Sequence, residues 1–233
     1  MTEIDGLRSH SATEWRHSLN RSLHEHLSTL RRMRPTPSRV ADLVASGRSL
    51  RIELGAPDSG RNGWITIDVT EACDLCWDLR YGLPFPDASV EAVYSSHFFE
   101  HLTYAQGQAL LQECLRTLKP GGTFSICVPN ARLYIEAYLG LRRIPKSAFG
   151  YAPAYHATTA IDAVNYMAYM DGAHRHMFDE DHLLHVLQAA GFVEVVTREM
   201  DPERDHAERE FESIHARAIK PAGPASPPKP SSC

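Results

Sequence analysis

Apolar and polar residues follow two different periods along this chain, and the period changes near residue 50. Before that point, apolar residues from Trp15 to Met33 recur every three or four positions behind a Ser-x-x-Glu capping box at Ser11. This spacing predicts an amphipathic helix. A shorter helix is predicted over 38–46, ending at Gly47.

After residue 50, short runs that alternate or are continuously apolar predict strands at 50–54, 64–68, 74–77, 90–94, 123–128, 192–197 and 211–219. Two further helices are predicted, one behind a capping box at Thr103 and one between the N-cap Asp179 and Gly191. A strand, a helix and a strand in sequence form a βαβ unit, whose strands are parallel. The sequence therefore predicts an α/β fold with a Rossmann-like, mostly parallel sheet, and the last two strands form an antiparallel pair at its edge.

The first connection of the sheet is unusually short. Only nine residues separate Leu54 from Trp64, whereas a crossover with its own helix needs about 10–12. We expect this crossover to be reduced to a turn, and the N-terminal helices to pack on the sheet face that it leaves open.

The same patterns divide the chain into a helical extension over 1–47, an α/β domain over 48–220 and a proline-rich tail over 221–233. The tail has too few apolar residues to order itself and is expected to be disordered. Residues 144–177, rich in tyrosine, histidine and methionine, are interpreted as an inserted lid or substrate wall. An interface of a homo-oligomer, or simple packing, is the alternative for this segment.

Composition narrows the choice of partners. The chain has 24 Lys and Arg against 29 Asp and Glu, a formal net charge of −5, so it lacks the basic excess typical of nucleic-acid binding. No run approaches the roughly 18 apolar residues of a membrane span, and the first thirty residues lack a secretory signal. Five cysteines do not form a disulfide framework. We expect a cytoplasmic protein with a small-molecule substrate.

Polar residues recur where the predicted strands end. They are Glu53 and Gly55, Asp68, Asp78, and the run Ser95, Ser96 and His97. In an open parallel sheet, ligands bind beyond the carboxyl ends of the strands. A glycine there lets a ligand approach the backbone, and an acidic residue after the second strand is placed to accept hydrogen bonds from ribose hydroxyls.

These strand ends carry recognisable motifs. They read RIELG (51–55), GWITID (63–68), DL (78–79) with LPFPD (83–87), SSHFFEH (95–101) and LKPGG (118–122). Over residues 48–200 the chain resembles the class I S-adenosylmethionine-dependent methyltransferases, and within them the small bacterial type-11 group. The resemblance implies S-adenosylmethionine as cofactor, with Glu53 and Gly55 at its amino-acid half and Asp68 at its ribose. Asp78 and Leu79 would contact the adenine, and Ser95 to His97 would flank the methyl group.

The implied reaction is methyl transfer to an oxygen or nitrogen of a small-molecule nucleophile. His97 is the preferred base or positioning residue, because imidazole titrates near neutral pH, and His174 and His176 are the alternatives. The turn Gly55-Ala-Pro-Asp-Ser-Gly60 departs from the family by placing Pro57 where further glycines are usual. A second hypothesis is therefore a non-catalytic binding or scaffold protein that has kept the fold and lost the donor pocket.

A third hypothesis is a zinc-dependent hydrolase. His97, Glu100 and His101 match the His-x-x-Glu-His signature of inverted zinc peptidases. That signature needs both histidines on one helix, whereas the capping box at Thr103 predicts that the helix begins later. Metal binding is for this reason not expected.

Overall fold

The computed structural model describes residues 27–58, 63–148, 150 and 158–223. The capping box at Ser11 and most of the helix predicted behind it lie outside these residues. The strands are β1 (Arg51–Leu54), β2 (Ile65–Asp68), β3 (Leu75–Cys76), β4 (Val90–Ser96), β5 (Leu118–Pro129), β6 (Val193–Thr197) and β7 (Ser213–Ile219). All seven overlap predicted strands, although β5 begins at Leu118, five residues before the start that the sequence predicted.

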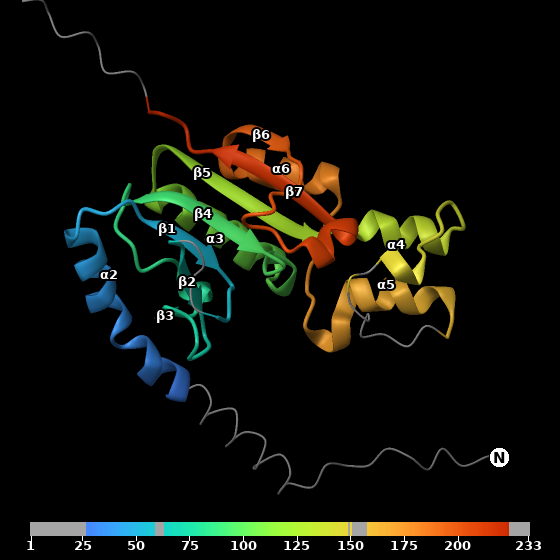
Figure 1. Ribbon diagram of the computed structural model, residues 1–233, viewed down its shortest axis with the longest axis horizontal. Coiled ribbons are helices and arrows are strands. Elements are labelled where there is room, and N and C mark those ends of the chain that lie inside the picture. The colour runs from blue at the N-terminus through green and yellow to red at the C-terminus, as the bar shows by residue number, and fades with distance from the viewer. Residues whose placement is uncertain (1–26, 59–62, 149, 151–157, 224–233) are drawn as a thin grey trace, which may run out of the picture.

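The strands form one sheet in the order β3-β2-β1-β4-β5-β7-β6 (Figure 1). Strands β1 to β5 pair in parallel, and β7 runs antiparallel to both β5 and β6. The predicted Rossmann-like sheet with an antiparallel edge pair is confirmed. The central strand is β4. Its neighbour β5 is buried from Phe124 to Pro129, as expected of a strand covered on both faces.

The helices are α2 (Thr36–Ala45), α3 (Tyr104–Thr117), α4 (Ala131–Tyr138), α5 (Ala160–Tyr169) and α6 (Glu180–Ala190). Single 3₁₀ segments are η1 (Leu79–Tyr81), η2 (Phe99–His101), η3 (Lys146–Ala148), η4 (Met170–Gly172) and η5 (Ala207–Glu212).

Local sequence signals account for the ends of the long helices. Thr103 and Gln106 form the predicted capping box of α3. Asp179 accepts a hydrogen bond from the His182 amide at the start of α6, and Gly191 ends that helix with a φ of 107°. Helix α4 was not predicted, and it begins at the N-cap Asn130, directly after β5.

The first crossover is reduced, as predicted. Its described residues, 55–58 and 63–64, contain no helix. Helix α2 instead packs beside β3 (Figure 1), where the Thr36 hydroxyl donates to the Cys76 carbonyl at 2.8 Å and Val40 enters the main core. The described N-terminal helix thus covers part of the sheet face that a longer crossover would cover.

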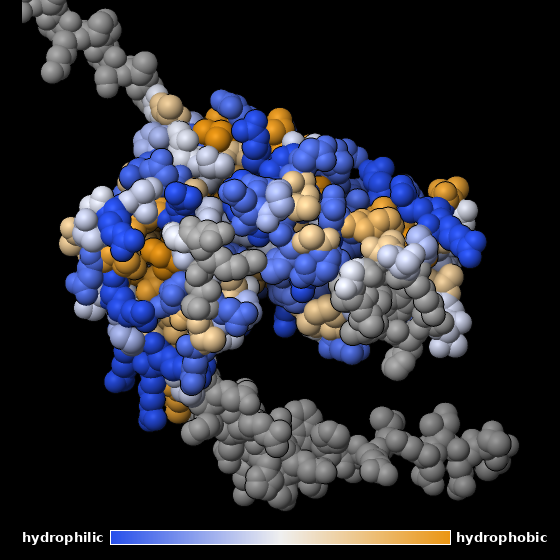
Figure 2. Space-filling model, in the orientation of Figure 1, coloured by the Kyte–Doolittle hydropathy of each residue, from blue (hydrophilic) through white to orange (hydrophobic). Residues whose placement is uncertain are grey.

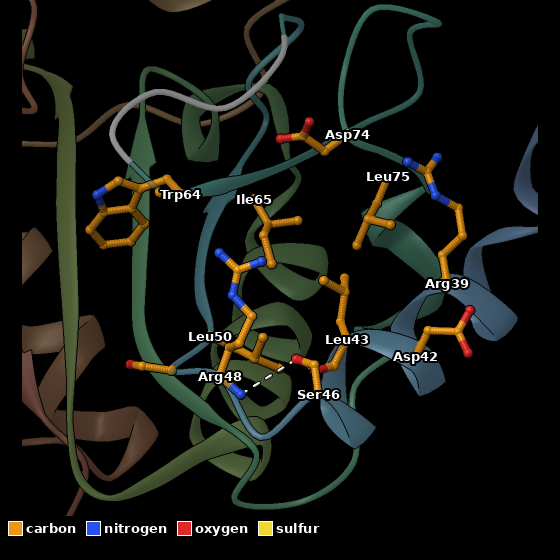
Figure 3. Close-up of a pocket in the computed structure, with 12 residues that line it drawn as sticks. Arg39, Asp42, Leu43, Ser46, Arg48, Leu50, Trp64, Ile65, Asp74 and Leu75 are labelled. Carbon is orange, nitrogen blue, oxygen red and sulfur yellow. Dashed lines mark hydrogen bonds between the residues drawn. The ribbon is translucent and has the colours of Figure 1, made fainter.

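The cover is incomplete and leaves a cavity of about 560 Å³ between α2 and the sheet (Figure 3). Its apolar floor is formed by Leu43, Leu50, Ile65 and Leu75, and charged residues such as Arg39 line its rim. Figure 2 shows apolar residues ringed by hydrophilic ones on the side that carries α2. Leu50 precedes β1, and Ile65 and Leu75 begin β2 and β3, so we call this hollow the amino-end cavity.

Helices α4 and α5 pack against each other beyond the carboxyl end of β5 (Figure 1). Leu133, Tyr134 and Met167 form a small buried cluster there, separate from the main core. The interpretation of 144–177 as a lid or substrate wall, and the domain boundaries, stay predictions. Within the described part of the chain, no helix is long and apolar enough to cross a membrane.

Candidate functional site

A second cavity, of about 470 Å³, opens at the opposite edge of the sheet. We call it the carboxyl-end cavity, because Gly55 follows β1 and His97 follows β4 on its wall. Its volume lies within the range of about 300–1,000 Å³ typical of small-molecule sites. Its lining residues are Glu53, Gly55, Ala56, Pro57, Asp58, Thr66, Ser96, His97, His206 and Arg209.

Four residues predicted from strand ends meet in this cavity, namely Glu53, Gly55, Ser96 and His97. Glu53 is buried at the end of β1. Gly55 has a φ of +73°, and a Cβ added there would lie 2.3 Å from the ring of Phe98. Both the backbone conformation and the close ring therefore require glycine at this position.

Two other predicted residues stand at the same sheet edge but do not line the cavity. Asp68 ends β2, where its carboxylate accepts the Thr70 amide hydrogen at 3.1 Å. Burial raises the pKa of Asp68 above its usual value. Ser95 is fully buried, and its hydroxyl donates to the Leu54 carbonyl at 3.4 Å.

The predicted adenine contacts are engaged within the fold. The Asp78 carboxylate accepts from the Arg80 guanidinium at 2.6 Å and from the Arg80 amide at 3.0 Å, which caps η1. Leu79 is buried in the main core. Their roles toward a ligand stay predictions.

Besides Asp58, in the turn after β1, sequence reasoning missed two titratable residues of the carboxyl-end cavity that come from far along the chain, His206 and Arg209. They lie in and just before η5, far along the chain from Glu53, and no local motif marks them. The antiparallel return of β7 beside β5 brings η5 to this edge. His206 also lies against an acidic residue, with its Nδ1 3.2 Å from Oε1 of Glu208.

His97 is held in one orientation at the cavity wall. It follows β4 with a φ of 48°, and its Nε2 lies 2.8 Å from the Ser213 hydroxyl oxygen. Since that hydroxyl donates its own hydrogen to the Arg209 carbonyl at 2.6 Å, Nε2 of His97 is the donor to Ser213. The lone pair is then on Nδ1, which lies 3.6 Å from Oε1 of Glu100.

Burial governs the charge of both partners. Burial, followed by the positive charges of Arg209 and His206, lowers the pKa of His97 to about 3. Burial raises the pKa of Glu100 to about 8. Burial thus holds both groups near neutrality at pH 7.

The two alternative histidines lie outside the cavity. His174 is buried, with its Nδ1 2.8 Å from the Met167 carbonyl oxygen. His176 has its Nε2 2.7 Å from Nε2 of His182 on α6. Burial lowers the pKa of both, and His182 adds to the shift at His176.

The His-x-x-Glu-His segment does not form the helix that a zinc-peptidase site needs. His97 is at a strand end, and Glu100 and His101 are in the single turn η2. The two histidines therefore do not share a helical face, in agreement with the predicted helix start at Thr103.

Residues 68–126 match the family model described as a methyltransferase domain, of the type-11 group. The resemblance inferred from the sequence is confirmed for this part of the chain. The matched segment contains Asp68, Asp78, Leu79 and the run from Ser95 to His97, whereas Glu53 and Gly55 precede it and His174 and His176 follow it.

A curated relative matches over a similar length. It is a probable S-adenosylmethionine-dependent methyltransferase of Mycolicibacterium smegmatis, 46% identical over 57 residues. This match covers 23% of the chain and 21% of the relative. The chain thus matches about a fifth of the relative's length.

Solved structures of similar shape include a phosphoethanolamine N-methyltransferase of Haemonchus contortus (14% identity, TM-score 0.48, covering 74% of this chain and 49% of that one). Another is a 1,6-didemethyltoxoflavin-N1-methyltransferase of Burkholderia thailandensis (15% identity, TM-score 0.46, covering 94% and 98%). At these identities and TM-scores, likeness in shape says nothing of what this chain binds.

Proposed function

We propose that this protein transfers a methyl group from S-adenosylmethionine to an oxygen or nitrogen of a small-molecule acceptor, using the carboxyl-end cavity. The match of residues 68–126 to a methyltransferase domain and the curated relative support the reaction class. The observation that carries the proposal is that Glu53 and Arg209, which are opposite in charge, both line this cavity.

The charges of the cavity fit the amino-acid end of the methyl donor. That end carries an ammonium and a carboxylate group. Glu53 is the acceptor for the ammonium, and the guanidinium of Arg209 offers the paired donors that suit a carboxylate. Asp68, at the same sheet edge, is assigned to the ribose hydroxyls. Asp78 and Leu79, which are also engaged within the fold, stay the predicted contacts of the adenine.

When bound, the methyl donor supplies a sulfonium-activated methyl group. The acceptor's lone pair forms the new bond to the methyl carbon as the carbon–sulfur bond breaks, and the acceptor then loses a proton. His206 is the proposed proton acceptor, because it lines the cavity and its Nδ1 is oriented by Glu208 at 3.2 Å. His97, whose Nε2–H is held by Ser213 and whose Nδ1 faces Glu100, is a positioning residue.

One observation favours the non-catalytic alternative. The ring of Phe98 covers Gly55, at the point where the resemblance places the amino-acid half of the donor. A scaffold protein with this arrangement would bind neither the donor nor its demethylated product. Calorimetry with that product separates the two hypotheses.

Isothermal titration calorimetry with S-adenosylhomocysteine is the test, and it uses matched variants at the two cavities. Arg209→Met and Glu53→Gln should each weaken binding by about 10–100-fold, the effect of losing one hydrogen bond to a charged group. Arg39→Met and Asp42→Asn, which remove the same charges at the amino-end cavity, should leave the affinity unchanged. Circular dichroism confirms that each variant is folded.

Two results would overturn the proposal. One is the absence of binding by the wild-type protein at millimolar S-adenosylhomocysteine. The other is an equal loss of affinity in the variants of the two cavities.

A further inference from the structure

Three side chains with metal-ligating atoms converge behind His97. Glu100 and His101 come from η2, and His174 follows η4. One carboxylate oxygen of Glu100 and one ring nitrogen of each histidine all lie within 4.8 Å of one another. The backbone brings the two segments together, because the amides of Arg175 and His176 both donate to the Glu100 carbonyl, at 2.8 and 3.2 Å.

Hydrogen bonds to the backbone fix the tautomers of both histidines. Nδ1 of His101 lies 3.0 Å from the Ala173 carbonyl oxygen, and Nδ1 of His174 lies 2.8 Å from that of Met167. A carbonyl only accepts, so each Nδ1 carries the hydrogen and each neutral ring has its lone pair on Nε2. This is the arrangement by which metal-binding histidines are oriented in proteins.

The burial of Glu100, together with its unpartnered oxygen, is an independent observation that points to a ligand. Its side chain is 3% exposed, and its Oε2 has no hydrogen-bond partner among the described residues. Its other oxygen lies 3.6 Å from Nδ1 of His97 and 4.0 Å from Nε2 of His101. Both of these nitrogens carry lone pairs by the tautomers assigned above. The neutral carboxyl has a single proton, which can meet only one of these two lone pairs, so buried polar atoms stay unmatched and cost free energy.

We propose that Glu100, His101 and His174 bind a divalent transition-metal ion, with Zn²⁺ as the best match. Two imidazoles and a carboxylate suit zinc, whereas Mg²⁺ and Ca²⁺ prefer oxygen ligands alone. Two ligand atoms at about 2.1 Å from a zinc ion lie about 3.4 Å apart in tetrahedral geometry. The three ligand atoms lie within 4.8 Å of one another, and Glu100 Oε1 and His101 Nε2 are 4.0 Å apart. Each separation would therefore close by at most about 1.4 Å on binding.

The proposed site differs from the zinc-hydrolase site of the His-x-x-Glu-His hypothesis in its ligands, and its role is structural and not catalytic. His174, from a distant part of the chain, takes the place of His97, whose Nε2 is committed to Ser213. The metal would join η2, next to the carboxyl-end cavity, to the segment that follows α5 and η4. It is a structural site, and it does not depend on the methyl-transfer proposal.

The test is zinc titration of the full, untagged chain after dialysis against EDTA, followed by calorimetry. We expect one Zn²⁺ per chain with micromolar or tighter affinity, and a higher melting temperature with zinc. His174→Gln and His101→Gln should each weaken binding at least tenfold. The side chain of His101 is 34% exposed, so His101→Gln should disturb folding less than His174→Gln. The test therefore does not depend on whether the His174 variant folds.

A second histidine pair provides the internal control. His176 and His182 have their Nε2 atoms 2.7 Å apart and are the competing zinc ligands. His182→Gln should leave the affinity unchanged, as should a change of the exposed His185 on α6. Visible absorption bands of tetrahedral Co²⁺ should develop in the wild-type protein and in His182→Gln but not in His101→Gln.

The proposal is overturned if the wild-type chain binds no zinc at 100-fold excess. It is also overturned if His182→Gln abolishes binding while His101→Gln retains it. Neither result bears on S-adenosylhomocysteine binding, so a failure here and a failure of the proposed function are distinguishable.

Discussion

Two buried carboxyl groups of this protein have opposite surroundings. Asp205 accepts hydrogen bonds from both terminal nitrogens of the Arg198 guanidinium, from the Tyr94 hydroxyl at 2.8 Å and from the Asp201 amide at 2.7 Å. Glu100 has histidines beside it and no Lys or Arg ion pair in the described part of the chain.

The pKa values follow these surroundings. Burial alone would raise the pKa of Asp205, but the hydrogen bonds from Arg198, the Asp201 amide and Tyr94 outweigh it and lower the pKa to about 2. At Glu100 burial dominates and raises the pKa to about 8. The carboxylate of Asp205, whose two oxygens both accept hydrogen bonds, links β4 to the segment between β6 and β7. The carboxyl of Glu100, with one oxygen that has no hydrogen-bond partner among the described residues, is where the proposed metal ion would bind.

Removing the charge of Asp205 should have the largest effect on stability. Asp205→Asn leaves the buried Arg198 guanidinium without its counter-charge, which costs about 3–5 kcal/mol of unfolding free energy. Urea denaturation measures it. Asp201→Asn is the matched control, because Asp201 pairs with Arg204 at 2.6 Å on a partly exposed surface and should cost less than about 1 kcal/mol. Equal losses in the two variants would contradict the comparison.

Lowering the pH should progressively remove the contribution of Asp205 to the free energy of unfolding. Its pKa is about 2 in the folded protein and about 3.9 in an unfolded chain, so its contribution to stability is complete above about pH 5 and is lost as the pH falls toward 2. The expected loss is about 2 kcal/mol. Arg198, Tyr94 and His215, with its Nε2 at 3.7 Å, face the carboxylate.

The measurement for this loss is the urea midpoint of wild-type protein and Asp205→Asn at pH values between 5 and 2. The difference between the two proteins should shrink over this range. A constant difference would show that Asp205 does not titrate as described.

Substitution of Glu100 in metal-free protein should have the smallest effect. Glu100→Gln keeps the shape of the side chain, and burial already holds the Glu100 carboxyl near neutrality at pH 7, so the unfolding free energy should change by less than about 1 kcal/mol. Urea denaturation after EDTA dialysis measures this change. A loss comparable to that of Asp205→Asn would mean that Glu100 has a structural counter-charge.

Much of the fold was predictable from local signals, because each element carries its own. Alternating runs marked the strands, and the capping residues Thr103 and Asp179 marked the starts of α3 and α6. Helix α4 was missed because it has only eight residues, which are too few to show a clear periodic spacing of apolar positions. The reduced first crossover was predictable because only nine residues separate Leu54 from Trp64.

The candidate site was predictable only in part. Strand ends converge by topology, which is why Glu53, Gly55, Ser96 and His97 meet. Arg209 and His206 reach the same cavity through the antiparallel pairing of β7, and no local pattern encodes that. The clustering of Glu100 and His101 with His174 likewise depends on a long-range contact.

A crystal structure of the protein soaked with S-adenosylhomocysteine tests the central claim most directly. We predict electron density in the carboxyl-end cavity, with the amino-acid end of the ligand between Glu53 and Arg209. Density beneath α2 in the amino-end cavity, or none in either cavity at a saturating concentration, would contradict the account.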